Sequence, residues 1–248
     1  MSLELITICW NAAETLPRTL ESVLSQCVLP SIYRFVDGGS TDGTLEILER
    51  YRPRFEAAGV EFSVEAQQRV PGAAGIPSAW NQALRSARGD VVGLLNADDW
   101  YDPRALQAAL AAFQADDGVD AVSIPVQMHH DDPAKEWLFV PQPLTRLTWK
   151  MPVPHPGTFF RRRVYEKLGL YDTRYRISAD YDFVWRCYLS GIRWKYLPET
   201  LVHMQLGGVA NASRALARRE TYRIARRHCH FLDFRPALAF VIRTLTGR

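Results

Sequence analysis

The chain has 248 residues, 47% of them hydrophobic, and its 30 Lys and Arg against 27 Asp and Glu give a formal net charge of +3. This length can bury one large core, and the small net charge, without a Lys/Arg tract and interleaved aromatics in the first 210 residues, argues against a nucleic-acid partner. Four cysteines without C-x-x-C spacing argue against a zinc site or a disulfide framework, and no apolar run approaches the roughly 18 residues of a membrane span, so we expect a soluble, cytoplasmic protein.

Short apolar runs alternate with helical patterns over the first 100 residues. The apolar runs are LELITICW, YRFVDGG, VEFSVEA and DVVGLLNA, and the helical patterns occupy residues 15–26, 43–58 and 76–88. This βαβ rhythm predicts an α/β fold with a mainly parallel central sheet flanked by helices. In such folds ligands bind at the carboxyl ends of the strands.

Polar side chains follow three of these expected strands. They are Asn11 after the first strand, Asp37 after the second, and Asn96, Asp98 and Asp99 after the fourth. Each of them alone is explained about equally well as a turn former or a helix cap, but their gathering at one sheet edge favours a ligand site. The two adjacent carboxylates need a positive partner, such as a metal ion or a substrate cation.

The loop VDGGSTDGT follows the second strand and either cradles a ligand or simply turns the chain. Its glycines permit close backbone approach, and its Ser, Thr and Asp side chains can cap the next helix. No G-x-x-x-x-G-K-[ST] and no G-x-G-x-x-G after the first strand are present, so neither a P-loop nor an ordinary dinucleotide site is expected.

The second half of the chain contains a long irregular segment and then a helix that begins with two acids. The segment from His129 to the FF of PHPGTFF is rich in Pro and Trp, and we interpret it as a wall of the site. In SADYDFVWRC, Ser178 is a candidate N-cap, and Asp180 and Asp182 fall in the first turn, where the helix dipole favours carboxylates. The dipole suffices to explain Asp182.

The composition changes at residue 212. From there to the end, nine Arg oppose two acids, which gives the tail a charge of +7 and leaves −4 for the rest. The tail, residues 212–248, is expected to be helical, and two interpretations stay open: it lies on an anionic membrane surface, or it packs on the preceding domain.

The ordered set ITICWN, VDGGSTDGT, GIPSAWNQAL, ARGDVVGLLNADDWYDP and ISADYDFVWR resembles family 2 glycosyltransferases of the GT-A fold, over roughly residues 3 to 209. Among these it looks most like the bacterial polysaccharide-biosynthesis branch. The resemblance implies a GT-A domain over 1–211, with a nucleotide-sugar-binding half (1–100) and an acceptor-side half (101–211).

The resemblance also implies roles for particular residues. Asp99, with Asp98, would hold Mn²⁺ or Mg²⁺ on the donor diphosphate, and Asp180 would be the catalytic base, although the Glu that precedes it in the family is Ala179 here. His203 is a further candidate metal ligand, for which a core or strand histidine is the favoured interpretation, and His155 is a candidate on the acceptor side. The donor-binding candidates are Ile8, Cys9, Asn11, Asp37, Gly75, Asn81, Asn96 and Asp98.

The function implied is inverting transfer of a sugar from a nucleotide-diphosphate sugar, with UDP as the commonest expectation, to a glycan or lipid-linked acceptor in cell-surface polysaccharide synthesis. The tail would place such an enzyme on the inner face of the cell membrane. Two alternatives remain at this point, a sugar-phosphate nucleotidyltransferase and a non-catalytic nucleotide-sugar-binding protein. The presence of Asp98, Asp99 and Asp180 argues against loss of chemistry.

Overall fold

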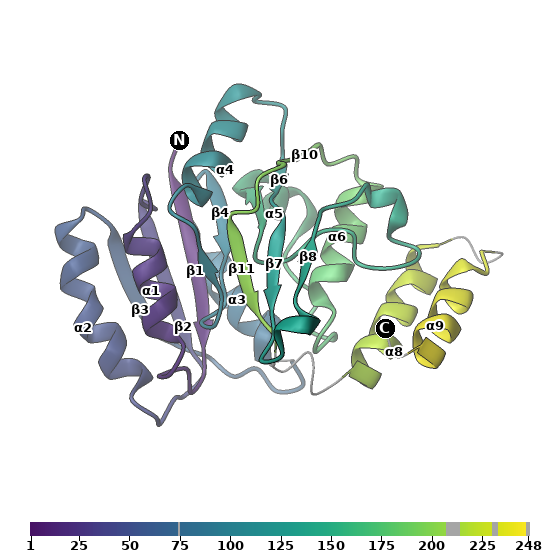
Figure 1. Ribbon diagram of the computed structural model, residues 1–248, viewed down its shortest axis with the longest axis horizontal. Coiled ribbons are helices and arrows are strands. Elements are labelled where there is room, and N and C mark those ends of the chain that lie inside the picture. Colours follow the sequence, from purple (N-terminus) through teal and green to yellow (C-terminus); the bar gives the residue numbers. More distant parts are fainter. Residues whose placement is uncertain (74, 207–213, 230–232, 247–248) are drawn as a thin grey trace.

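The computed structural model describes residues 1–73, 75–206, 214–229 and 233–246 (Figure 1). The first half of the chain alternates strands and helices in the order β1 Leu3–Cys9, α1 Leu16–Leu24, β2 Ile32–Asp37, α2 Thr44–Ala57, β3 Glu61–Ala66, α3 Gly75–Arg85 and β4 Val91–Leu94. The three helices begin and end within three residues of the expected ranges, so the βαβ rhythm is confirmed.

The second half contains shorter strands. Its elements are β5 Trp100–Tyr101, α4 Ala105–Ala115, β6 Ala121–Ser123, β7 Val126–His129, β8 Trp137–Phe139, β9 Thr158–Arg161, α5 Arg162–Leu168, α6 Ala179–Leu189, β10 Trp194–Tyr196 and β11 Val202–Gln205. Two helices, α8 Arg214–His228 and α9 Arg235–Thr246, follow. The run VDAVSIPVQ is divided between β6 and β7, which belong to different sheets.

The central sheet has seven strands in the order β10-β6-β9-β4-β1-β2-β3. Strands β1 to β4 are parallel where they pair, whereas β9 is antiparallel to both of its neighbours, β4 and β6. Every residue of β2 is buried, as expected for a central strand covered on both faces. The mainly parallel α/β fold is therefore confirmed, and a second sheet, β5-β11-β7-β8, adjoins it.

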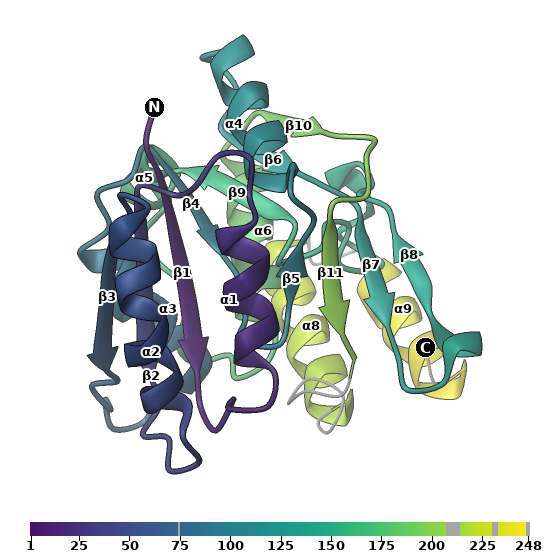
Figure 2. The ribbon, with the colours of Figure 1, turned by 60° about the vertical axis from the view of Figure 1, so that its left-hand side comes forward.

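Alternate residues of the strands face two separate apolar clusters. On one face, Leu3 and Leu5 pack with α1, α2 and α4; on the other, Ile6 packs with α3, α5 and α6. Figures 1 and 2 show α1 and α2 on one side of β1 and β2, with α3 behind them. This layering leaves the carboxyl ends of β1, β2 and β4 free to carry polar side chains.

A third cluster joins helix α8 to the domain. Ile224 and Ala225 of α8 pack with Val184 and Trp185 of α6 and with the irregular segment at Leu147. Figure 1 shows α8 and α9 beside each other at one end of the molecule, next to α6. The expected boundary after residue 211 thus separates two segments that share a core.

Candidate functional site

The strand register brings the polar strand ends together. Cys9 lies opposite Asp37, and the backbone N–H of Leu95 donates to the carbonyl of Ile6, so β1, β2 and β4 end at one edge of the sheet. Asn11 and Asn96 follow at this edge. The structure therefore assembles the strand-end residues expected from the sequence.

Hydrogen bonds link the loops after β1 and β2 to each other. The backbone N–H of Asn11 donates to Ser40 Oγ at 2.8 Å, and the Asn11 amide oxygen accepts from the backbone N–H of Thr41 at 2.9 Å. Asn11 has a φ of +48°, a left-handed conformation that Asn tolerates better than most residues. The loop VDGGSTDGT is thus fixed against the first strand end.

Asp37 builds this loop from within. Its carboxylate is buried and accepts hydrogen bonds from the backbone N–H groups of Gly39 (2.8 Å) and Ser40 (2.9 Å) and from the Ser40 hydroxyl. Gly39 has a φ of +91°, which explains why a glycine stands there. These bonds give Asp37 a structural function, and its contact with a nucleoside stays a prediction.

The neighbouring donor candidates are mostly apolar or already bonded. Ile8 is half-buried, and burial, together with the charge of Asp37, raises the pKa of the Cys9 thiol well above its usual value. Asn81 is buried and exchanges two hydrogen bonds with the backbone of Tyr171, at 2.8 and 2.9 Å. Gly75 begins α3, and its carbonyl accepts from Gln67. Asn81 therefore ties α3 to the segment before α6, and donor contacts of these residues stay predictions.

The acidic pair lies in an environment that disfavours negative charge. Asp99 is fully buried, and burial and the adjacent Asp98 raise its pKa well above the usual value. Its Oδ2 accepts from Asn96 Nδ2 at 3.0 Å, and the backbone of Gln205 also opposes the pKa shift, whereas its Oδ1 has no hydrogen bond of regular geometry among the described residues. Burial also raises the pKa of Asp98, while the charge of Arg18 opposes that shift.

The orphaned oxygen of Asp99 fits a divalent cation. A hard cation such as Mn²⁺ or Mg²⁺ prefers carboxylate oxygen and commonly takes only one or two protein carboxylates, with phosphates and water completing its shell. Within the part of the chain that the structure describes, no three His, Cys, Asp or Glu side chains form a metal cluster. Metal binding by Asp99 with Asp98 stays a prediction.

His203 lies on the second sheet, opposite Trp100 in the pairing of β11 with β5. Its ring stacks on Trp100 at 5.2 Å and 4°, and its Nδ1 lies 3.0 Å from Nε2 of His129. Its Nε2 lies 3.2 Å from a carboxylate oxygen of Asp102, but outside hydrogen-bond geometry. His203 is therefore a strand histidine, as the favoured interpretation of the sequence expected. Metal ligation by His203 stays a prediction.

A small pocket joins the end of β4 to the start of α6. Its lining includes Leu94, His155, Thr158, Tyr171, Asp180 and Phe183. The candidate base and the candidate acceptor-side histidine, 25 residues apart in sequence, therefore share one cavity.

Burial disfavours the charged forms of the three titratable groups in the lining of this pocket, Asp180, His155 and Tyr171. Burial raises the pKa of Asp180 to about 6, and the negative charge of Glu220 contributes to the shift, while the backbone N–H of Tyr181, 2.8 Å from Asp180 Oδ1, opposes it. Burial lowers the pKa of His155 to about 4, so this imidazole is neutral at pH 7, and it stacks on Trp80 at 4.5 Å. Asp180 is ionised at pH 7 but is a stronger base than an ordinary aspartate.

Asp182, two residues further on, has a different environment. It is buried and bonded to Arg186 Nε at 2.9 Å and to His228 Nε2 of α8 at 3.0 Å. Burial alone would raise its pKa, but the hydrogen bonds from His228 and Arg186 lower it. Asp182 therefore connects two helices, a function that its place in the first turn did not reveal.

Sequence reasoning also missed Glu220, one of only two acids in the basic tail. It is 5% exposed and accepts hydrogen bonds from the backbone N–H groups of residues 176, 177 and 178, directly before α6. Ser178 precedes α6 as expected, but its hydroxyl bonds to the carbonyl of Ala217 instead of capping α6. The scarcity of acids in the tail is the only signal that singles out Glu220.

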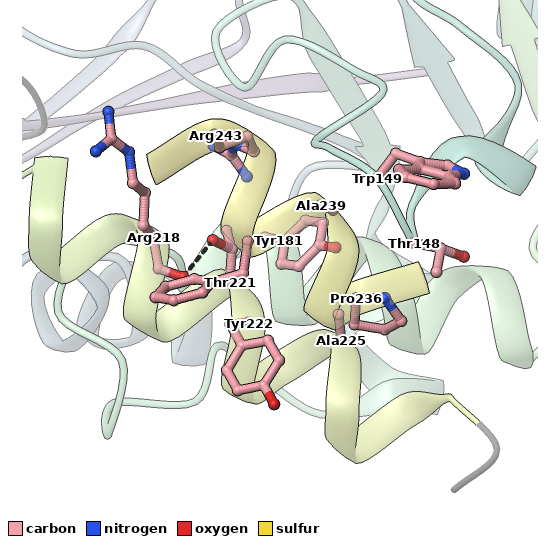
Figure 3. A pocket seen from close by; sticks show the side chains of 11 residues that line it. Thr148, Trp149, Tyr181, Arg218, Thr221, Tyr222, Ala225, Pro236, Ala239 and Arg243 are labelled. Carbon is pink, nitrogen blue, oxygen red and sulfur yellow. Dashed lines mark hydrogen bonds between the residues drawn. The ribbon is translucent and has the colours of Figure 1, made fainter. Parts of the chain in front are cut away.

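A second pocket lies between α8 and α9 (Figure 3). It is lined by Tyr181 of α6, by Arg218 and Tyr222 of α8, and by Ala239 and Arg243 of α9. None of the site residues expected from the sequence lines it. This pocket belongs to the junction of the three helices and not to the sheet edge.

The chain is similar to known proteins of one family. The model of the family described as glycosyl transferase family 2 matches residues 4–169. A PGL/p-HBAD biosynthesis glycosyltransferase of Mycobacterium bovis is 29% identical over 204 residues, which are 81% of this chain and 76% of that protein. A chondroitin synthase of Escherichia coli is 34% identical over 110 residues, 43% of this chain and 14% of that protein.

Solved structures agree on the fold. TarS 1-349 of S. aureus in complex with UDP-GlcNAc has a TM-score of 0.71 at 21% identity, covering 92% of this chain and 65% of that one. A mannosyltransferase from Pyrobaculum calidifontis in complex with GDP-Man and Mn²⁺ has a TM-score of 0.69 at 22% identity. The match covers 97% of this chain and 69% of that one. Both are similar to this chain in their α/β architecture.

Proposed function

The chain belongs to glycosyl transferase family 2, and we propose that it is an inverting, metal-dependent glycosyltransferase with Asp180 as the catalytic base. The observation that carries the proposal is the pocket between β4 and α6, in which Asp180 has a pKa raised to about 6. A half-buried carboxylate with a raised pKa is suited to accept a proton during transfer.

The reaction is a single displacement at the anomeric carbon. The acceptor hydroxyl oxygen forms a bond to that carbon, its proton passes to the Asp180 carboxylate, and the bond to the diphosphate oxygen breaks with release of the nucleoside diphosphate. His155, neutral at pH 7, borders the same pocket and is available to orient the acceptor. Attack opposite the leaving group inverts the anomeric configuration.

The donor diphosphate would bind at the carboxyl edge of β1, β2 and β4. Asp99 and Asp98 would hold Mn²⁺ or Mg²⁺ there, and this cation would neutralise the charge that develops on the leaving diphosphate. The fixed loop after β2 and the donor-binding candidates named above would line the nucleotide. TarS binds UDP-GlcNAc and the Pyrobaculum enzyme binds GDP-Man, so a UDP-sugar is our first expectation and a GDP-sugar the next to test.

The acceptor is proposed to be a glycan or a lipid-linked molecule at a membrane surface. Among the helices that the structure describes, none has both the length and the apolar composition of a membrane span. On α9, however, Leu238, Val241 and Leu245 are 42%, 49% and 81% exposed at helical spacing, and the tail carries a charge of +7. An apolar helix face beside excess positive charge fits the surface of an anionic bilayer.

A product assay tests the proposed reaction. The protein is incubated with UDP-GlcNAc or GDP-mannose and Mn²⁺, with and without candidate acceptors, and released phosphate species are separated. We expect a nucleoside diphosphate whose release depends on the metal and is lost in Asp180→Asn. Pyrophosphate release would instead indicate a nucleotidyltransferase, and binding without any release would indicate a non-catalytic protein.

A further inference from the structure

The strongest unexplained feature of the molecule is a buried carboxylate on the C-terminal helix α8. Glu220 Oε1 accepts from the backbone N–H of Arg176 at 2.8 Å, and Oε2 accepts from those of Ile177 and Ser178, both at 2.9 Å. Glu220 is only 5% exposed, although it stands in the most basic part of the chain. A carboxylate is rarely buried this fully unless its oxygens have fixed partners.

Glu220 accepts hydrogen bonds from three backbone amides, and these amides belong to the residues directly before α6. They precede Ala179, the first residue of the helix, and Asp180 follows it. Because these N–H groups lie before the helix, they have no acceptor within it, and here a single carboxylate from a distant helix satisfies all three. The backbone that presents Asp180 to its pocket is thus held from α8.

We infer that Glu220 is a positioning residue for the transfer reaction: from α8 it fixes the backbone of residues 176–178 and thereby the carboxylate of Asp180. The inference rests on the proposed function of Asp180 as the base. Glu220 lies outside residues 4–169, over which the family model matches. Helix α8 accordingly contributes to the catalytic site.

Glu220 also affects the charge of the base. The titratable groups around Asp180 are Glu220 from α8, His155 from the segment before β9, and Tyr171 from the segment before α6. Of these, Glu220 carries a negative charge that raises the pKa of Asp180, whereas neutral His155 and Tyr171 add no charge at pH 7. Removal of the Glu220 charge should therefore lower the pKa of Asp180.

The test compares two substitutions that separate charge from position. Glu220→Gln turns an amide N–H₂ group toward N–H donors, so kcat should fall by up to about 100-fold. The substitution also removes the negative charge, so the acid limb of the kcat–pH profile, where kcat falls as Asp180 is protonated, should move to lower pH. Glu220→Asp keeps the charge but withdraws it by one methylene, so kcat should fall while the acid limb stays in place. The reaction measured is Mn²⁺-dependent hydrolysis of UDP-GlcNAc or GDP-mannose, with donor KM expected to change little in both variants.

Ile224→Ala is the matched control, because Ile224 is buried where α8 packs on α6 but, as an aliphatic side chain, accepts no hydrogen bond. It should lower Tm without moving the acid limb. If Glu220→Gln and Glu220→Asp lower Tm but leave kcat and the pH profile as in Ile224→Ala, the positioning role is wrong. If Glu220→Gln does not fold, Glu220→Asp alone decides: wild-type kcat in that variant overturns the inference.

Asp180→Asn distinguishes failure of this inference from failure of the proposed function. An inactive Asp180→Asn with fully active Glu220 variants would overturn only the inference. An active Asp180→Asn would overturn the proposed base and the inference together.

Discussion

Asp180 and Asp182 occupy the same turn of α6 but differ in their hydrogen-bond partners. Asp182 is bonded to a guanidinium and an imidazole, and these bonds lower its pKa. Asp180 receives one backbone N–H, and burial raises its pKa to about 6. One carboxylate is therefore stabilised in its charged form, whereas the other is kept ready to accept a proton.

Substitution of each aspartate by asparagine separates these functions. Because the folded-state pKa of Asp180 exceeds that of the unfolded chain, the wild type loses stability as pH rises from about 4 through about 6. Asp180→Asn should therefore leave Tm at pH 8 equal or higher, while kcat falls by about 10²- to 10⁴-fold. Asp182→Asn should do the reverse and lower Tm with little loss of kcat.

The wild-type kcat should also decline below an apparent pKa near 6, as Asp180 takes up its proton. Thermal melts at pH 5 and 8 with kcat profiles over the same range provide the measurement. A near-normal kcat in Asp180→Asn would exclude it as the base.

Asp99 permits a similar test at the sheet edge. Burial raises its pKa well above the usual value, so replacement by the neutral Asn should not lower Tm at pH 8. If Asp99 holds the cation, Asp99→Asn should weaken Mn²⁺-dependent donor binding by more than the roughly 10- to 100-fold that loss of an outer partner of a metal site costs. Calorimetry with UDP and GDP, with and without Mn²⁺, measures the effect; equal affinity in the wild type and the variant would contradict the assignment.

At the scale of elements, α8 and α9 differ in how far they belong to the domain. Helix α8 contributes Ile224 to a buried cluster with α6 and is further joined to α6 by the Asp182–His228 contact. Helix α9 packs on α8, through contacts such as that between Phe240 and Tyr222, and exposes much of its opposite face. Of the two interpretations of the tail, packing on the domain therefore describes α8. The other interpretation, contact with a membrane surface, is proposed for α9.

Two truncations distinguish the helices. Removal of residues 230–248 should leave the fold and the donor affinity intact. Removal of residues 207–248 also exposes the cluster in which Ile224 packs on α6, and it should lower Tm. Burial of Ile224 alone contributes about 1.5–3 kcal/mol, which corresponds to roughly 3–12 °C of Tm in a chain of this size. Thermal melts of both forms test this, and an unchanged Tm in the longer deletion would mean that α8 is not part of the folded unit.

At the scale of the whole molecule, charge and apolar surface are unevenly distributed. The tail has a charge of +7 and the remainder −4. The exposed side chains of Leu238, Val241 and Leu245 extend along α9, and Phe234, just before it, is 72% exposed. This end of the molecule is therefore the one that we expect to face a membrane.

Vesicle pelleting tests this orientation. Leu238→Glu with Leu245→Glu should abolish binding to vesicles of phosphatidylglycerol and phosphatidylcholine at low salt, because the substitutions remove apolar area and add negative charge. Leu189→Glu is the control, since Leu189 is 58% exposed but stands at the end of α6 and not on α9. Equal pelleting of the wild type and the double variant would reject the membrane surface as the partner of α9.

The sequence by itself determined what depends on neighbours along the chain. The alternation of apolar runs and helical patterns predicted β1 to β4 and α1 to α3, because side-chain periodicity is a local property. It also placed Asp37 and Asp99 at one sheet edge, since parallel strands joined by helices must end on the same side. The presence of Asp180 in the first turn of α6 followed in the same way.

Only the tertiary structure decided which polar groups meet. Glu220 and Ser178 are 42 residues apart, His129 and His203 are 74 apart, and Asn81 and Tyr171 are 90 apart. A sequence states that such side chains can accept or donate hydrogen bonds, but the partner depends on how helices and strands pack. The pKa of Asp180 depends on the same packing, because the pocket that buries it forms only when α6 packs near β4, and the charge of Glu220 lies near it only when α8 packs on α6.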